Sequence, residues 1–404
     1  MGKVTARMGT ASDETNETIR LLEGDAGDEG VVRACEAVES WTKAGRWQDL
    51  VALAEALESR CEPGDKTRRG SFETVADHVE DQLALAAEDA AIDALLELSL
   101  RDRQRSVEVP RPRSLRIRAF ASRLGYGQTP QAFLGALERA RERAELHELL
   151  ACWMHEVVLR GSSLANEARA SRFREEALVK AGHPLAALPL ELRPTEREAP
   201  SYMPLYGDKG LGRAIDTLAS GPMSARTIPP PADGAAVRAT RVDDPGVIDL
   251  MTAAVRPWAE GKSGKVEAKV FALDPQVSSS AVGSWLLRAL PLESTAASAR
   301  LDVSRIGPEG VFGPLFSAAS NGGAYSSGLG GAYGRLAAWI SLGALVGASE
   351  GAGVDAIAKL AASSTFLTFR TPGPWFHDVA WDLGVLVVRE GGRSVAVLAA
   401  TDTE

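Results

Sequence analysis

The chain has 404 residues, of which 45% are hydrophobic and 25% are charged, and its formal net charge is -9. This composition is ordinary for a globular protein, and the length suits about two to three domains. The negative charge argues against a nucleic-acid-binding protein, which needs a basic face to displace counterions from phosphates. The longest apolar run, at 336–348, is too short to cross a bilayer. We therefore expect neither a nucleic-acid nor a membrane partner.

The cysteines also restrict the class of protein. Cys35, Cys61 and Cys152 are odd in number and form no CxxC pair, which is typical of a reducing compartment rather than of a disulfide-stapled secreted protein. The opening residues are polar and mixed in charge, unlike a secretory signal. We predict a cytoplasmic protein.

The first half of the chain has a helical pattern. Residues 1–27 show little periodicity and are predicted to form a flexible arm. Over 28–190 apolar residues recur at helical spacing, which predicts an all-α domain of paired helices. Thr129 followed by Pro130, for example, is a helix-start signal. The architecture is similar to tetratricopeptide-like helical repeats, but no fixed period aligns the pairs. A repeat array and a plain bundle therefore both stay open.

The second half differs in composition. The stretch 191–234 is rich in proline and predicts an interdomain linker. Residues 235–404 mix strand-like alternation with helical segments, and the clearest strands, 385–388 and 395–399, flank a Glu-Gly-Gly-Arg turn at 390–393. We predict a multidomain α and α+β protein. Its helical-repeat or bundle domain is followed by a mixed α/β sheet domain that ends in a β-hairpin.

The most unusual stretch is a glycine-rich loop at 321–335, in which Gly-Gly-Ala-Tyr occurs twice before a predicted helix. Glycines let a backbone approach a ligand closely, and a helix N-terminus offers free amides to an anion. The spacing fits neither the dinucleotide-binding nor the P-loop fingerprint, so no cofactor is predicted. A loop that packs closely on the protein itself is the commoner meaning of such glycines. The candidate ligand-binding residues are Gly323, Tyr325, Gly330, Gly331, Tyr333 and Arg335.

A second candidate site is the segment 370–382. It places His377 beside Asp378, with Asp382 close in sequence, and imidazole and carboxylate groups are common general acids and bases. These three residues are weak catalytic candidates. The flanking aromatic residues suit the walls of such a site, but they are more often part of a core.

A third candidate lies on the helix predicted at about 145–160. Glu148, Cys152 and His155 share one face of that helix, and their oxygen, sulfur and nitrogen atoms are ligands that zinc accepts. A fourth ligand is not evident, and a buried cysteine beside a packed histidine is more usual. No metal is predicted, and the three residues stay weak candidates.

Two stretches of the C-terminal part carry a resemblance to a known family. They are Gly-Gly-Ala-Tyr-Gly-Arg-Leu-Ala-Ala-Trp at 330–339 and Val-Ala-Trp-Asp-Leu-Gly at 379–384, together with the ending Leu-Ala-Ala-Thr-Asp at 398–402. This part resembles a little-studied actinobacterial family of unknown function. The resemblance implies a bacterial, actinobacterial origin and brings no catalytic residues with it.

Two functional hypotheses follow. The first is a non-enzymatic protein-protein interaction, regulatory or immunity-like protein, which uses the helical scaffold to hold a protein partner. The alternative is an enzyme or a nucleotide- or phosphate-binding protein, with its site at 322–335 and 375–382. Convergence of these two segments on one concave pocket favours the alternative, whereas a loop packed on its own sheet favours the first hypothesis.

Overall fold

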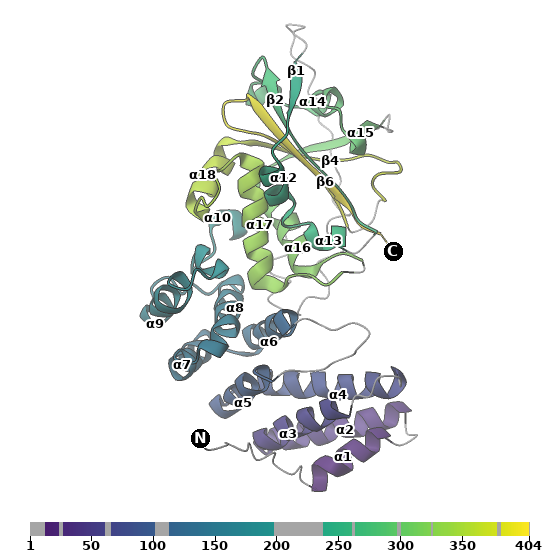
Figure 1. The fold of residues 1–404 in the computed structure, drawn as a ribbon, viewed down its shortest axis with the longest axis vertical. Helices are drawn as coiled ribbons and strands as arrows, with labels where there is room; N and C mark the ends of the chain where they lie inside the picture. Colours follow the sequence, from purple (N-terminus) through teal and green to yellow (C-terminus); the bar gives the residue numbers. More distant parts are fainter. Residues whose placement is uncertain are drawn as a thin grey trace, which may run out of the picture. The chain divides into compact units, whose positions relative to one another are not determined.

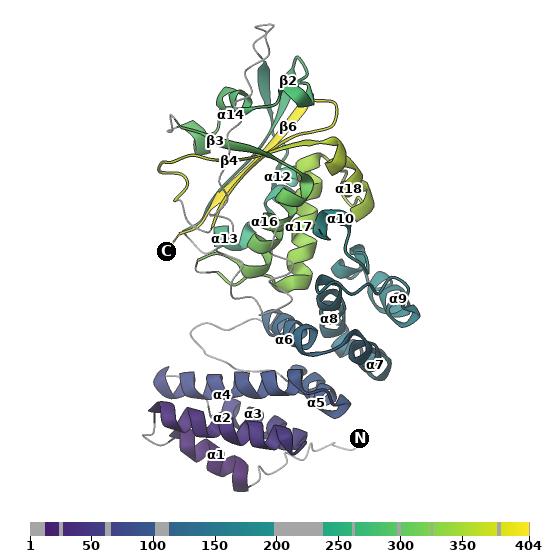
Figure 2. The same cartoon turned by 180° about the vertical axis from the view of Figure 1, so that it is seen from behind.

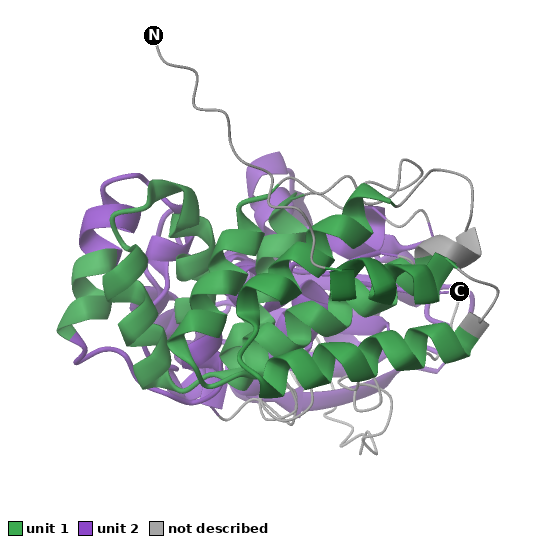
Figure 3. Cartoon of the chain, turned by 90° about the horizontal axis from the view of Figure 1, so that it is seen from below, with its two compact units in different colours: residues 1–154, 168–173 green, residues 155–167, 174–404 purple. Residues whose placement is uncertain are grey.

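The chain divides into an all-helical unit and a unit built on a β-sheet, as Figure 3 colours them. Unit 1 comprises residues 1–154 and 168–173, and unit 2 comprises residues 155–167 and 174–404. The computed structural model describes the following residues: 13–23, 27–60, 66–101, 113–197, 237–260, 263–296, 300–324, 326–377 and 381–403.

Most of the predicted arm (1–27) and of the predicted linker (191–234) lies outside the described residues. Of the arm, residues 13–23 form the helix α1, and of the linker, residues 194–197 form the helix α10. The helical domain was predicted to run to residue 190, whereas by contact residues 155–167 and 174–190 group with the sheet. Long-range hydrogen bonds to the helices beside the sheet, described below, hold part of this stretch there.

Unit 1 consists of helices that pack on their neighbours, with α4 in contact with α2, α3, α5 and α6. α7 shows how the sequence sets a helix boundary, because Thr129 Oγ1 accepts a hydrogen bond from the Ala132 amide and Pro130 is the first helical residue. The helices are α1 (Asp13–Glu23), α2 (Gly27–Lys43), α3 (Trp47–Ser59), α4 (Lys66–Leu85), α5 (Asp89–Ser99), α6 (Arg113–Gly127), α7 (Pro130–Ala140), η1 (Ala144–Leu146), α8 (His147–Leu159, whose last residues belong to unit 2) and α9 (Ala168–Phe173).

Unit 2 is built on an antiparallel sheet, and short and long helices pack on this sheet (Figure 1). Its strands are β1 (Arg238–Val242), β2 (Lys265–Asp274), β3 (Asp302–Ile306), β4 (Thr365–Arg370), β5 (Asp382–Val388) and β6 (Ser394–Thr401). Its helices are η2 (Arg174–Val179), η3 (Pro184–Ala187), α10 (Pro194–Arg197), α12 (Pro245–Thr252), α13 (Arg256–Glu260), η6 (Ser279–Ala281), α14 (Ser284–Ala289), α15 (Glu293–Ala296), α16 (Pro308–Asn321), α17 (Gly330–Val346) and α18 (Val354–Ser363).

The strands of the described chain lie in the order β1-β2-β6-β5-β4-β3, and every neighbouring pair is antiparallel. The predicted C-terminal hairpin is confirmed: β5 pairs with β6, and Val388 lies opposite Val395. Gly391 and Gly392 occupy the turn with φ of 80° and 68°, a left-handed backbone that favours glycine. The predicted fold class, helical followed by α+β, is confirmed.

The centre of the sheet is covered on both faces. α16 and α17 lie side by side, and both contact the strands (Figures 1 and 2). Val395 and Val397 of β6 join α14 in one hydrophobic cluster, while Ala396 and Leu398, which alternate with them, are also fully buried. Within the described residues, no helix is both long and apolar enough to span a membrane.

Candidate functional site

The glycine-rich loop joins α16 to α17 and packs against the edge of its own domain. Its Gly322 carbonyl accepts a hydrogen bond from Trp258 Nε1 of α13 at 3.0 Å. The Ala324 amide donates to Asp402 Oδ2 at 2.8 Å, just beyond the end of β6. The other carboxylate oxygen of Asp402 accepts from Ser263 Oγ at 2.6 Å. A fully buried aspartate thus anchors the loop to the sheet.

Close packing accounts for several glycines of this loop. A Cβ on Gly323 would lie 2.0 Å from Asp402 Oδ2, and one on Gly328 would lie 2.1 Å from the Ser320 carbonyl oxygen. Gly322 has a φ of 82°, and a Cβ there would lie 2.3 Å from the Ser326 carbonyl oxygen. Of the other predicted ligand residues, Gly330 and Gly331 begin α17 and Tyr333 is half-buried in it, whereas Tyr325 lies outside the described residues.

Arg335, predicted to bind an anion, lies in the interior of unit 2, where its guanidinium is fully buried. Its Nε and Nη2 donate to the carboxylate of Glu196 at 2.5 and 2.9 Å. The remaining N–H groups donate to His155 Nδ1 and to the carbonyls of Pro189 and Glu191. Because a guanidinium has five N–H donors, this set occupies all of them within the protein.

The other members of this cluster complete the pairing. Trp339 Nε1 of α17 donates to Glu196 Oε1 at 3.0 Å, and the Arg193 amide donates to Glu196 Oε2 at 2.7 Å. His155 Nε2 donates to the Leu185 carbonyl, so its Nδ1 is the acceptor for Arg335. Burial, reinforced by the positive charge of Arg335, holds the pKa of His155 well below its ordinary value. The cluster therefore consists of a neutral histidine and the ion pair of Arg335 with Glu196, and it joins α10 to α17.

Two of the proposed acid/base residues, His377 and Asp382, lie shortly before and at the start of β5. Asp382 is buried, and its Oδ1 accepts from Thr401 Oγ1 at 2.6 Å and from the backbone amide of His377 at 3.3 Å. His377 itself is exposed, and Asp378 lies outside the described residues. Phe376 belongs to the hydrophobic cluster that includes Val395 and Val397 of β6, and Trp375 packs against this cluster. The aspartate therefore orders the turn before the strand.

The three weak metal candidates are also engaged within the protein. Cys152 Sγ donates to Glu148 Oε1 at 3.6 Å, while both ring nitrogens of His155 bond to Arg335 and Leu185. Within the described residues, no group of three or more His, Cys, Asp and Glu side chains is placed to hold a metal ion.

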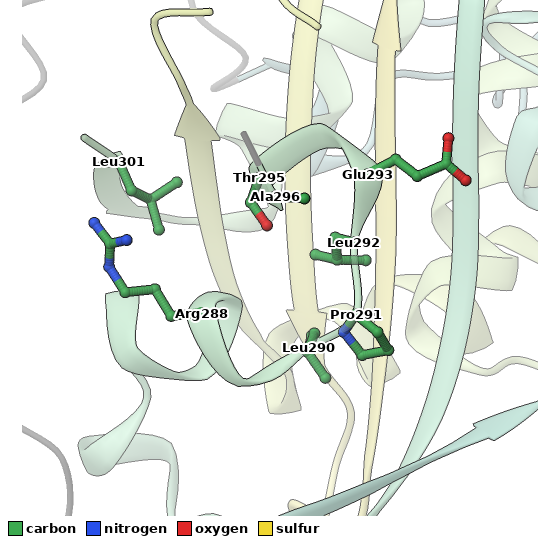
Figure 4. Close-up of a pocket in the computed structure, with 8 residues that line it drawn as sticks. All are labelled: Arg288, Leu290, Pro291, Leu292, Glu293, Thr295, Ala296 and Leu301. Atoms are coloured by element: carbon green, nitrogen blue, oxygen red, sulfur yellow. The ribbon is translucent and has the colours of Figure 1, made fainter. Parts of the chain in front are cut away.

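The two candidate segments of unit 2 are linked through Asp402. The Asp402 amide donates to the Trp381 carbonyl, and the same residue's carboxylate accepts from the glycine-rich loop. A cavity of about 460 Å³ in unit 2 lies elsewhere, between α14 and α15 (Figure 4).

Unit 1 carries a different kind of candidate, an exposed apolar pair where α4 and α6 end. Leu85 and Tyr126 are 47% and 49% exposed. Gly127 brings them together, because a Cβ at Gly127 would lie 2.4 Å from the Ala84 carbonyl oxygen and 3.0 Å from the Leu85 Cα atom. Gln128 Nε2 then donates to the carbonyls of Ala84 and Ala86 at 2.6 and 2.7 Å. These contacts join the two helix ends, while Leu85 and Tyr126 stay about half exposed.

Acidic residues flank this pair. Asp77, Asp81 and Leu85 are four residues apart, so they share one face of α4. Arg123 of α6 forms ion pairs with Asp77, Glu80 and Asp81 at 3.6, 2.6 and 2.5 Å. Arg123 thus lies among three carboxylates of α4. We call Asp77, Asp81, Leu85, Arg123 and Tyr126 the α4–α6 surface.

Comparison with known proteins gives a family. A family model described as a family of unknown function, DUF6183, matches residues 32–404. The chain belongs to this family. No curated protein and no solved structure matches the chain.

The DUF6183 match extends the resemblance noted in the C-terminal sequence. That resemblance to a family of unknown function involved the last part of the chain, whereas the family match begins within α2 and includes both units. The α4–α6 surface and the glycine-rich loop are therefore both within the family region. The actinobacterial origin and the likeness to tetratricopeptide repeats stay predictions.

Proposed function

We propose that this DUF6183 member is a non-enzymatic protein-interaction scaffold that binds a protein partner through the α4–α6 surface of unit 1. The observation that carries the proposal is the half-exposed pair of Leu85 and Tyr126 on helix ends fixed by Gly127 and Gln128. Tyrosine on a rigid, partly apolar surface is a frequent centre of binding energy in protein interfaces.

The charge around the pair suggests what the partner carries. Because the carboxylates of Asp77 and Asp81 lie on the face of α4 that ends at Leu85, the surface suits a segment with an apolar anchor and flanking Lys or Arg residues. A regulatory or immunity-like role in the cytoplasm of an actinobacterium is part of the same proposal, since such proteins act by holding a partner rather than by chemistry.

The internal pairing in unit 2 supports this hypothesis over the enzymatic or nucleotide-binding alternative. The glycine-rich loop packs on Asp402 and Trp258, and the guanidinium of Arg335 is occupied by protein groups. A loop already filled by its own domain offers little to a phosphate. A thermal-shift screen with nucleoside triphosphates is expected to give no change in melting temperature, and a reproducible rise would favour the alternative.

The experiment compares partner capture by the wild-type chain and by Tyr126→Ala. A stoichiometric partner captured from lysate and then purified should bind Tyr126→Ala about thirtyfold more weakly, the loss typical of an interfacial tyrosine. Val32→Ala is the matched control, because Val32 is an exposed apolar residue on α2 of the same unit (56%). Equal affinity of the two variants for the purified partner would refute the surface as the binding site.

A further inference from the structure

Strand β1 forms one edge of the sheet in unit 2 (Figure 1). On one side it pairs with β2 along its whole length, and within the described chain no strand pairs with its other side. Most of its residues are exposed, including Val242 at 42%. A strand edge of this kind presents a row of amides and carbonyls that another strand can bond.

The register of β1 on β2 identifies which backbone groups face outward. The Leu273 amide of β2 donates to the Arg393 carbonyl, on the side of β6. Because successive residues of a strand direct their amides and carbonyls to opposite sides, Ala272 directs its own toward β1, where it lies opposite Thr240. Thr240 therefore bonds to β2, and the residues directly before and after it direct their amides and carbonyls away from the sheet.

The two faces of β1 also differ in their side chains. Ala239 packs against the hydrophobic cluster of the sheet, whereas Thr240 and Val242, on the opposite face, are exposed. Arg241 forms an ion pair with Asp243 at 2.7 Å, so its charge is compensated within its own chain. The edge therefore carries outward-facing backbone groups, an exposed hydroxyl and an exposed apolar residue.

These features suit antiparallel pairing of β1 with β1 of a second copy, about a two-fold axis at Thr240. Ala239 and Arg241, which face outward, would then lie opposite each other and exchange backbone hydrogen bonds. Val242 would lie opposite Arg238, whose aliphatic stem can cover it. Thr240 would lie opposite its own copy, and a pair of threonines is a favourable cross-strand pair. No arginine would lie directly opposite another.

The neighbouring registers are less favourable. An axis at Arg241 places that arginine directly opposite its own copy, and like charges directly opposite each other are destabilising. An axis at Ala239 leaves Val242 beyond the end of the second strand, where it stays exposed. The axis at Thr240 overlaps the five residues of both strands completely.

We propose that this chain forms a two-fold dimer through β1, in which the sheets of two copies join into one continuous antiparallel sheet. The interface is independent of the α4–α6 surface, because β1 belongs to unit 2. A five-residue strand buries little surface, and small interfaces are weak, so the dissociation constant should be on the order of 10–100 µM.

Sedimentation velocity of the full chain, from about 1 to 500 µM, measures this association. The wild type should change from monomer to dimer across the range. Thr240→Lys places two ammonium groups opposite each other and should weaken association at least about fivefold, whereas Thr240→Val creates a β-branched apolar pair and should strengthen it about threefold. Ser363→Lys on α18 is the matched control, because it adds the same charge at another exposed hydroxyl residue of unit 2, and it should associate as the wild type does.

Cysteine cross-linking tests the position of the axis. The Cα atoms of the two copies of Thr240 would be about 4.5 Å apart, within the range of about 4.4–6.8 Å that a disulfide bridges. Thr240→Cys should therefore form a covalent dimer on oxidation. Arg238→Cys should not, because its two copies would lie about 14 Å apart. The wild type, with its own three cysteines, gives the background.

Thermal melting verifies that each variant is folded, and the opposite shifts expected for Thr240→Lys and Thr240→Val cannot both come from partial unfolding. The proposal is overturned by a chain that stays monomeric at the highest concentration, which is also the result expected if an unrelated protein pairs with this edge. It is equally overturned by the same dissociation constant for Thr240→Lys and Ser363→Lys, or by equal cross-linking of Thr240→Cys and Arg238→Cys.

Discussion

The glycine-rich loop of unit 2 and the α4–α6 surface of unit 1 use their polar and apolar groups in opposite ways. In the loop, amides, carbonyls and the neighbouring Arg335 bond to other parts of the domain. On the α4–α6 surface the polar groups hold the backbone, and Leu85 and Tyr126 stay half exposed. A conspicuous sequence can therefore mark close packing, while a half-exposed apolar surface can leave almost no mark in the sequence.

The strongest loss of stability is expected when the buried ion pair between Arg335 of α17 and Glu196 of α10 is disrupted. Glu196→Ala leaves the guanidinium of Arg335 buried without its counter-charge, which typically costs about 3–5 kcal/mol. We expect a loss of this size in the free energy of unfolding measured by urea denaturation. The double variant Glu196→Leu with Arg335→Met removes both charges and should recover much of it. A single variant as stable as the wild type would mean that Arg335 is not held as described.

The second prediction concerns the glycines themselves. Gly323→Ala should destabilise unit 2 by about 2 kcal/mol, because its Cβ would lie 2.0 Å from Asp402 Oδ2. Gly70→Ala is the control: Gly70 is helical with nothing within 4 Å of an added Cβ, so alanine there should slightly raise stability. If both substitutions behave alike in denaturation, close packing is not the reason for the glycine at 323.

The third prediction is a dependence of stability on pH. The pKa of His155 is depressed in the folded state by burial and by Arg335, so below pH about 6.5 the unfolded chain binds a proton that the folded chain does not. Stability should therefore fall as the pH is lowered from there, by up to about 1.4 kcal/mol per pH unit. Unfolding measured at neutral and at mildly acidic pH should show a smaller decrease for His155→Gln. His377→Gln, which changes an exposed imidazole, should keep the wild-type decrease.

Features of the fold that depend on residues close in sequence could be predicted from the sequence. The β5–β6 hairpin and the start of α7 were predictable, because a Glu-Gly-Gly-Arg turn and a Thr-Pro pair act on residues close in sequence. The role of Arg335 was not, because Glu196 and His155 are 139 and 180 residues away from it. The α4–α6 surface could not be predicted for the same reason. The sequence places Tyr126 at a helix end, but its position beside Leu85 depends on tertiary packing.

Loss of the exposed tyrosine should have the least effect on stability. Tyr126→Ala should change the free energy of unfolding by less than about 0.5 kcal/mol, because the ring is half exposed. Gly127→Ala, one residue on, should cost about 2 kcal/mol, because its Cβ would lie 2.4 Å from the Ala84 carbonyl oxygen. Comparing the free energies of unfolding of the two variants shows whether folding depends on the backbone at Gly127 and not on the Tyr126 side chain. If Tyr126→Ala were as unstable as Gly127→Ala, the tyrosine would belong to the scaffold, and its loss of partner binding would reflect unfolding rather than a missing contact.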